Sequence, residues 1–143
     1  MGKAATERRT AAASLRVVDE SASMDLQMSL RKSGNVTIVD VCGRITSGTS
    51  GDSFSAELRR LAESTPGGVL INLAEVTQMD SSGIGALVQS YVMVTRSGGS
   101  LKLLNPTGKV REVLEVTRLT TALPTYADEA RAVASFSGTA FEA

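Results

Sequence analysis

The sequence has 143 residues, of which 42% are hydrophobic but only 3% aromatic, and its 15 basic and 15 acidic side chains cancel. The length fits one domain with an aliphatic core, and the balanced charge argues against direct binding of nucleic acid through bulk charge. The absence of histidine excludes Ser-His-Asp catalytic machinery and the ordinary zinc sites, while the single cysteine excludes an internal disulfide and fits a cytoplasmic protein.

Residues 1–23 are rich in Ala, Ser, Thr and Arg and have no sustained apolar period. This composition predicts a flexible N-terminal extension, with a short helical piece around residues 11–18. No stretch of the chain approaches the roughly 18 consecutive apolar residues of a membrane helix, which argues against a membrane protein. We therefore expect one ordered domain over residues 24–136, followed by a C-terminal tail over residues 137–143.

The domain begins with the pattern of a β-hairpin. Apolar and polar residues alternate over residues 26–30, residues 32–35 supply a turn, and residues 36–42 read as the second strand. A loop rich in Gly, Ser and Thr is expected over residues 43–51. Cys42, on the second strand, is interpreted as a small buried apolar residue rather than a redox site.

Downstream of this loop, segments with helical periodicity alternate with short apolar strands, separated by cap and turn residues. In chain order we expect a helix capped by Ser50 or Asp52 and reaching about Glu63, a strand over 69–73, a helix from Ile84 to Gly98-Gly99, a strand over 101–104, a helix from Thr107 to about Thr117, an edge strand over 123–126 and a helix from Asp128 to about Phe136. This order predicts an α/β domain with a mixed β-sheet of about four to five strands, an opening β-hairpin followed by parallel crossovers, flanked by about four helices.

The faces of the first two helices follow from residue spacing. In the first helix, the apolar residues that share one face are Phe54, Leu58, Leu61 and Ala62. In the second helix, the apolar stripe at i, i+3, i+4 and i+7 consists of Ile84, Leu87, Val88, Tyr91, Val92 and Thr95.

The segment Asp80-Ser81-Ser82-Gly83-Ile84-Gly85 lies between a buried strand and an amphipathic helix. Open α/β sheets place functional loops there, beyond the carboxyl ends of their strands. The helix start directs unpaired N–H groups at the loop, Ser81 or Ser82 can be its N-cap, and the glycines allow another surface to approach. The segment is therefore either a capped helix start with no further role or a functional loop.

Known phosphate-binding and catalytic motifs do not fit this segment. The chain has no G-x-x-x-x-G-K-[ST] string, and Val88 stands where a dinucleotide fingerprint needs its third glycine. A nucleophile elbow needs G-x-S-x-G together with a histidine, and the sequence has neither. Ser81 is thus more credible as a phosphoacceptor than as a nucleophile.

The chain resembles the STAS domain of bacterial anti-sigma factor antagonists over about residues 24–136. The resemblance is carried by INLAEVTQMDSSGIGALVQSYVMVTRSGGSLKLLNP, followed by TGKVREVLEVTRL. Its most specific piece is the stretch from Met79 to Gly85, which is supported by Gly98-Gly99-Ser100-Leu101 at the spacing of the family.

This resemblance implies a regulator that acts by partner switching, without catalytic activity or a cofactor of its own. In such proteins the unphosphorylated form binds an anti-sigma factor that is itself a GHKL-type serine kinase, and a sigma factor is released. The kinase, which supplies ATP and magnesium, phosphorylates the serine after the aspartate, and a metal-dependent serine phosphatase resets the cycle. Carried over to this chain, the phosphoacceptor is Ser81 with Ser82 as the runner-up, and Asp80 contributes to kinase recognition or phosphotransfer.

The resemblance also implies that the loop after the hairpin helps to bind the partner. Many relatives carry an acidic residue soon after the first glycine of this loop, where this chain has Arg44-Ile45-Thr46-Ser47. The expected partner-binding residues are Asp80, Ser81, Ser82, Gly83, Ile84, Gly85, Arg44 and Thr46. Two other functions stay open, namely a STAS accessory subunit of a lipid-transport ATP-binding cassette system and a scaffold subunit of a stress-signalling complex. The sequence does not indicate an oligomeric state.

Overall fold

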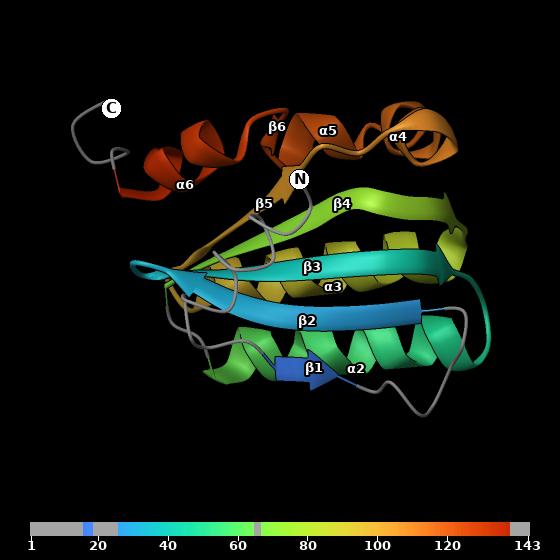
Figure 1. Ribbon diagram of the computed structural model, residues 1–143, viewed down its shortest axis with the longest axis horizontal. Helices are drawn as coiled ribbons and strands as arrows, with labels where there is room; N and C mark the ends of the chain where they lie inside the picture. The colour runs from blue at the N-terminus through green and yellow to red at the C-terminus, as the bar shows by residue number, and fades with distance from the viewer. Residues whose placement is uncertain (1–15, 19–25, 65–66, 138–143) are drawn as a thin grey trace, which may run out of the picture.

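The computed structural model of the chain describes residues 16–18, 26–64 and 67–137 (Figure 1). Within them, six strands form one β-sheet in the order β1-β2-β3-β4-β5-β6. The strands are β1 (Arg16–Val18), β2 (Leu26–Ser33), β3 (Val36–Ile45), β4 (Gly68–Met79), β5 (Ser100–Leu104) and β6 (Thr125–Tyr126). The helices are α2 (Thr49–Ser64), α3 (Ser81–Arg96), α4 (Gly108–Val116), α5 (Leu119–Ala122) and α6 (Glu129–Ser137).

The sheet is mixed, as the alternation of strand and helix patterns predicts. β1 pairs antiparallel with β2, and β2 pairs antiparallel with β3, whereas β3–β4, β4–β5 and β5–β6 are parallel neighbours. The predicted fold class, with its opening hairpin and parallel crossovers, is therefore confirmed. The described residues contain six strands and five helices rather than four to five and four, because β1 and α5 are too short to show a periodic pattern.

The N-terminal part of the described chain differs from the prediction. The helical piece expected over residues 11–18 is wrong where the structure describes it, because Arg16–Val18 forms strand β1. Pairing with β1 supplies partners for backbone groups of β2, which would otherwise form the edge of the sheet. The rest of the extension predicted over 1–23 lies outside the described residues, as does the predicted tail beyond Ser137.

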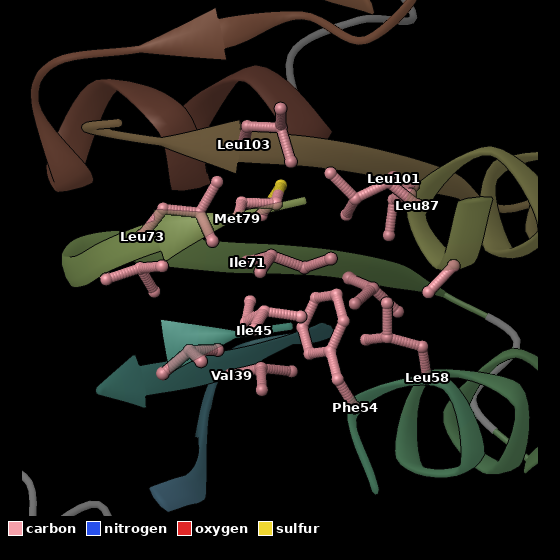
Figure 2. Close-up of a cluster of buried hydrophobic side chains, with 14 of the residues drawn as sticks. Val39, Ile45, Phe54, Leu58, Ile71, Leu73, Met79, Leu87, Leu101 and Leu103 are labelled. Atoms are coloured by element: carbon pink, nitrogen blue, oxygen red, sulfur yellow. The ribbon is translucent and has the colours of Figure 1, made fainter. Parts of the chain in front are cut away.

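Two apolar clusters lie on opposite faces of the sheet. The larger one joins the sheet with α2, α3 and α4, and Figure 2 shows Phe54 of α2 directed at the sheet near Ile45. The predicted face of α2 is confirmed, because its four apolar residues are all buried. The smaller cluster lies under α6 and consists of Val36, Ile38, Leu70, Leu104 and Ala132. Since β4 contributes to both clusters, it is a strand buried on both faces, as the apolar run over 69–73 predicts, and β3 and β5 also contribute to both.

Helix α3 buries a face that only partly coincides with its predicted apolar stripe. Val88 and Val92 are 42% and 41% exposed, although the stripe includes both of them. The residues of α3 that are buried are mainly small, namely Gly83, Ala86, Leu87, Ser90 and Val94. A Cβ atom added to Gly83 would lie 2.6 Å from Cγ of Met79, so the small residues let the helix approach the sheet closely. The predicted stripe is thus confirmed for Leu87, which is buried, and for Ile84 and Tyr91, which pack against the larger cluster, but it is wrong for Val88 and Val92.

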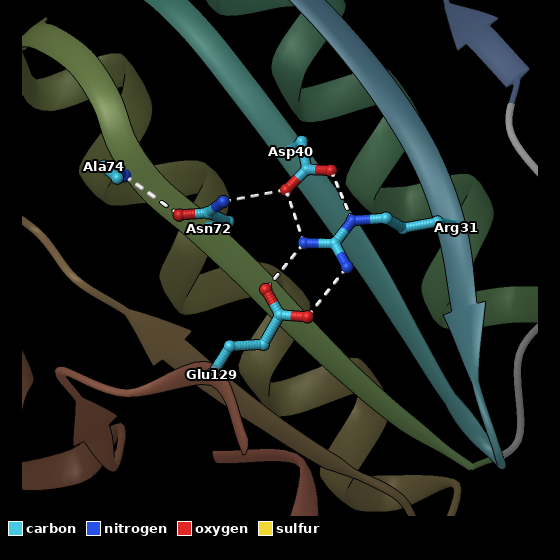
Figure 3. Close-up of polar contacts among 5 residues, drawn as sticks. All are labelled: Arg31, Asp40, Asn72, Ala74 and Glu129. Atoms are coloured by element: carbon cyan, nitrogen blue, oxygen red, sulfur yellow. Dashed lines mark hydrogen bonds and ion pairs between the residues drawn. The ribbon is translucent and has the colours of Figure 1, made fainter. Parts of the chain in front are cut away.

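A polar network attaches α6 to the sheet on the face opposite α2 and α3 (Figure 3). The guanidinium of Arg31 donates to both carboxylate oxygens of Asp40, at 2.6 and 3.1 Å, and to both of Glu129, at 2.8 and 2.7 Å. Asn72 donates to the same Asp40 carboxylate at 2.7 Å and accepts from the N–H of Ala74 at 3.1 Å. The hydrogen bonds of Arg31 to the two carboxylates raise its pKa, with those to Glu129 as the main cause. The first turn of α6 is thus tied to β2, β3 and β4.

Cys42 is exposed, and its interpretation as a buried apolar residue is wrong. Along β3 the neighbouring Val41 points into the larger cluster, so Cys42 points to the other face of the sheet. The cluster under α6 includes Ile38, on the earlier part of the strand, but not Cys42. Burial of that face therefore depends on where α6 lies, which the strand pattern of β3 does not encode.

Candidate functional site

The predicted motif lies at the junction of β4 and α3, beside the end of β3. Ile45 and Met79, the last residues of these two parallel strands, are register partners, and the N–H of Asp80 donates to the carbonyl of Ile45 at 3.1 Å. The loop between β3 and α2, residues 46–48, therefore lies at the same edge of the sheet as the motif. Both following helices, α2 and α3, begin at this edge.

Asp80 is the N-cap of α3, rather than Ser81 or Ser82 as the sequence predicts. Its backbone is extended, with φ −110° and ψ −164°, and its carboxylate accepts a hydrogen bond from the N–H of Ser82 at 2.9 Å. Aspartate is among the preferred N-cap residues, because its oxygen satisfies an N–H of the first turn that has no partner within the helix. Ser81 is consequently the first residue of the helix and is not needed to cap it.

The two serines of the motif have different surroundings. The side chain of Ser82 is half-buried, and its hydroxyl donates to Oδ1 of Asp80 at 2.7 Å. Ser81 is exposed, and among the described residues its hydroxyl has no hydrogen-bond partner. The hydroxyl of Ser81 is therefore accessible to a reagent from solution, whereas that of Ser82 is held within the helix cap.

The loop of residues 46–48 joins this site through a residue that the sequence reading missed. Ser47 donates to Oδ2 of Asp80 from its N–H at 2.8 Å and from its hydroxyl at 3.2 Å. Thr46, an expected binding residue, donates its N–H to the Ser50 hydroxyl at 3.0 Å and is half-buried. The signal that could have indicated Ser47 is topological, because loops after neighbouring parallel strands meet at one edge of the sheet.

A close contact between the starts of α2 and α3 defines the shape of the site. Gly51, in the first turn of α2, is buried, and a Cβ atom there would lie 2.5 Å from Oγ of Ser82 and 2.6 Å from the carbonyl oxygen of Thr46. The N–H of Gly51 also donates to that carbonyl at 2.7 Å. Only a residue without a side chain allows the two helix starts to approach this closely.

The other expected binding residues occupy varied positions. Gly83 is buried against Met79, and Ile84 is half-buried and packs against the larger cluster. Gly85 is exposed with open space around its Cα. Arg44 is exposed on β3, where its register partner is Gln78 rather than a residue of the motif. The structure thus brings Asp80, Ser81, Ser82 and residues 46–48 together. Gly83 and Ile84 instead pack against residues of the larger cluster.

The carboxylate of Asp80 accepts four hydrogen bonds in all, two from Ser82 and two from Ser47. These bonds, first of all that from the Ser82 hydroxyl, lower the pKa of Asp80 to about 2. Hydrogen bonds to the ionised form favour that form. Asp80 therefore carries a full negative charge at any physiological pH.

We expect Asp80→Asn to lower the free energy of unfolding by about 1 kcal/mol at neutral pH, because an amide oxygen accepts fewer and weaker hydrogen bonds than a carboxylate. The pKa of Asp80 is lower in the folded chain than the ordinary value of 3.8, so its ionised form stabilises the fold above about pH 4 and that contribution is lost toward about pH 2. Urea unfolding at several pH values should show a constant difference between wild type and variant from about pH 7 to about pH 5, which shrinks below about pH 4. A difference that stays constant to about pH 2.5 would contradict this assignment.

Within the described residues, no group of three or more His, Cys, Asp or Glu side chains is arranged to hold a metal ion. No helix in the described part of the chain is long and apolar enough to cross a bilayer.

A family model and a curated relative identify the family, and solved structures show the same fold. A model described as the STAS domain matches residues 27–132. The chain is 32% identical over 101 residues to the anti-sigma-B factor antagonist of Bacillus subtilis (strain 168), a match that covers 67% of this chain and 86% of that protein. Similar solved structures include an anti-sigma factor antagonist from Mycobacterium paratuberculosis, with a TM-score of 0.70, 20% identity and coverage of 80% of this chain and 97% of that one. Another is the Bacillus cell fate determinant SpoIIAA in its phosphorylated form, with a TM-score of 0.59, 19% identity and coverage of 74% and 96%.

Proposed function

The chain belongs to the STAS domain family, and from this premise we propose that it is an anti-sigma factor antagonist. In this proposal the protein is a regulator of transcription that catalyses no reaction itself. Its unphosphorylated form binds an anti-sigma factor in the cytoplasm and thereby releases a sigma factor. The named function of the Bacillus subtilis relative supports this assignment, because the match covers most of that protein.

The proposed switch is reversible phosphorylation of Ser81 by the bound anti-sigma factor, acting as a GHKL-type serine kinase. The hydroxyl oxygen of Ser81 attacks the γ-phosphorus of ATP held by the kinase, the bond from that phosphorus to the bridging oxygen breaks, and ADP leaves. The hydroxyl proton passes to a base of the kinase. A metal-dependent serine phosphatase then hydrolyses the phosphoserine and restores the starting form.

The observation that carries this proposal is the contrast between the two serines of the motif. Ser81 is exposed at the first position of α3, and the described residues hold no hydrogen-bond partner for its hydroxyl. The hydroxyl of Ser82 donates to Asp80 at 2.7 Å, so a kinase would have to break the helix cap before using it. Ser81 is therefore the acceptor in this proposal, and Ser82 is not.

A phosphate on Ser81 is compatible with the fold and disruptive to a protein contact. It adds about 1.5 to 2 negative charges at the N-terminus of α3, where helix N–H groups and the helix dipole favour an anion. In a complex, however, the same dianion is buried beside the ionised carboxylate of Asp80. The partner therefore loses affinity without any refolding of this chain.

An affinity pull-down from a lysate of the source cell, with and without ATP, followed by mass spectrometry of the bait, tests the proposal. We expect a GHKL-type serine kinase on the beads and, with ATP, the mass of one phosphate on Ser81. Ser82→Ala should be phosphorylated like the wild type, and Ser81→Ala should stay unmodified while retaining the kinase.

Three outcomes would contradict the proposal. Full phosphorylation of Ser81→Ala would show that another residue is the phosphoacceptor. Capture of a transporter ATPase without any gain in mass would indicate an accessory transport subunit. Recovery of the chain in a megadalton particle without a kinase would indicate a scaffold subunit.

A further inference from the structure

The carboxylate of Asp80 joins two segments that are distant in sequence. Oδ1 accepts from the N–H and the hydroxyl of Ser82, and Oδ2 accepts from the N–H and the hydroxyl of Ser47. A carboxylate offers about four lone-pair positions, so these four donors occupy all of them. A binding partner could engage Asp80 only by displacing one of these internal hydrogen bonds.

The two joined segments are the first turn of α3 and the loop of residues 46–48. The loop is also anchored at its first residue, Thr46, which exchanges hydrogen bonds with Ser50 and accepts from the N–H of Gly51. Ser47 itself is exposed, and its bonds to Asp80 hold the middle of the loop against α3. Within the described residues, the hydrogen bonds that Ser47 donates thus all go to one carboxylate.

That carboxylate is next in sequence to Ser81, so a charge on Ser81 acts on it directly. A phosphate on Ser81 and the carboxylate of Asp80 repel each other and compete for the same N–H groups at the start of α3. Protonation of Asp80 does not relieve this repulsion at neutral pH, because the hydrogen bonds in the unmodified chain lower the pKa of Asp80 to about 2, far below neutrality. A shift of the carboxylate away from the phosphate would weaken the bonds that cross to Ser47.

We propose that Asp80 is a positioning residue that transmits the charge on Ser81 to the loop of residues 46–48. With an uncharged Ser81, Asp80 holds Ser47 and the loop is ordered against α3. With a phosphate on Ser81, the hydrogen bonds from Ser47 to Asp80 are weakened, and the amide of Ser47 is exposed to solvent more often. The inference rests on the proposed phosphorylation of Ser81, and it adds that the partner meets two altered elements, the modified serine and a loosened loop.

Amide hydrogen exchange measured by NMR on the full chain tests this coupling without any partner protein. Ser81→Glu mimics the charge, and Ser81→Gln is the matched variant of the same size without it. We expect the amide of Ser47, which donates to Asp80, to exchange roughly three times faster in Ser81→Glu than in Ser81→Gln, since exchange reports local opening. Gln89→Glu, which adds the same charge to an exposed position two turns further along α3, should leave this amide unchanged.

The pathway through Asp80 is tested by combining substitutions. In Asp80→Asn the amide of Ser47 should already exchange fast, and adding Ser81→Glu should accelerate it no further. Equal exchange in Ser81→Glu and Ser81→Gln would overturn the proposal, as would acceleration by Ser81→Glu in the Asp80→Asn background or acceleration across the whole chain. Because no kinase takes part in the exchange experiment, its failure would not contradict phosphorylation of Ser81. Conversely, a chain that is not phosphorylated in lysate would contradict the proposed function without changing the exchange result.

Discussion

Replacing Ser81 with aspartate is expected to weaken binding of the proposed kinase partner by somewhat over a hundredfold, which corresponds to about 3 kcal/mol. The new carboxylate lies beside Asp80, whose own charge is held by four hydrogen bonds, so the complex must desolvate two adjacent anions. The fold should tolerate the change, because Asp80 and not Ser81 caps α3 and because an acidic residue is favourable in the first turn of a helix.

Titration calorimetry with the kinase recovered from lysate measures this effect, and Ser81→Asn is the neutral control of matched size. The control should bind within roughly threefold of the wild type, a difference of less than about 1 kcal/mol. The thermal midpoint of Ser81→Asp should stay within a few degrees of the wild-type value. Equal affinity of the two variants would show that charge at this position does not control the partner, and a large drop of the midpoint would show that Ser81 mainly stabilises the helix.

Replacing Phe54 with alanine is expected to lower the free energy of unfolding by about 3–5 kcal/mol. Phe54 is 0% exposed and packs between α2 and the sheet beside Val39, Ile45 and Leu58 (Figure 2). The loss combines the transfer free energy of the ring with the cavity that it leaves. It is a large part of the roughly 5–15 kcal/mol by which a domain of this kind is stable.

Urea denaturation measures this loss, provided that the slope of the free energy against denaturant stays unchanged. Val116→Ala is the control, because Val116 is 81% exposed, and the control should shift stability by no more than about 0.5 kcal/mol. A loss below about 1 kcal/mol in Phe54→Ala would mean that the larger cluster repacks around the missing ring. That result would contradict a rigid contact between α2 and the sheet at the edge that carries the site.

Local pattern was sufficient for the features that depend on neighbours in sequence. Alternation of polar and apolar residues predicts the hairpin of β2 and β3, and helical spacing between glycine and proline signals predicts the order of the later elements. The motif around Ser81 is also a contiguous string, which is why the family resemblance could be drawn from it. Each of these features is determined by backbone propensity and burial within one short segment.

The tertiary structure decided which groups from different segments meet. The buried side of α3 is set by how closely Gly83 approaches Met79, and the exposure of Cys42 is set by where α6 lies on the sheet. Asp80 caps α3 through a local bond to the N–H of Ser82, but it also binds Ser47, 33 residues earlier in the chain, because the parallel pairing of β3 and β4 brings the ends of the two strands together. Periodicity describes one element at a time, whereas the choice of donors for a shared carboxylate depends on strand register and helix placement over the whole domain. The sequence by itself therefore determined the fold class, the motif and, through the family resemblance, the preference for Ser81, whereas only the tertiary structure showed that Ser47 shares the carboxylate of Asp80 with Ser82.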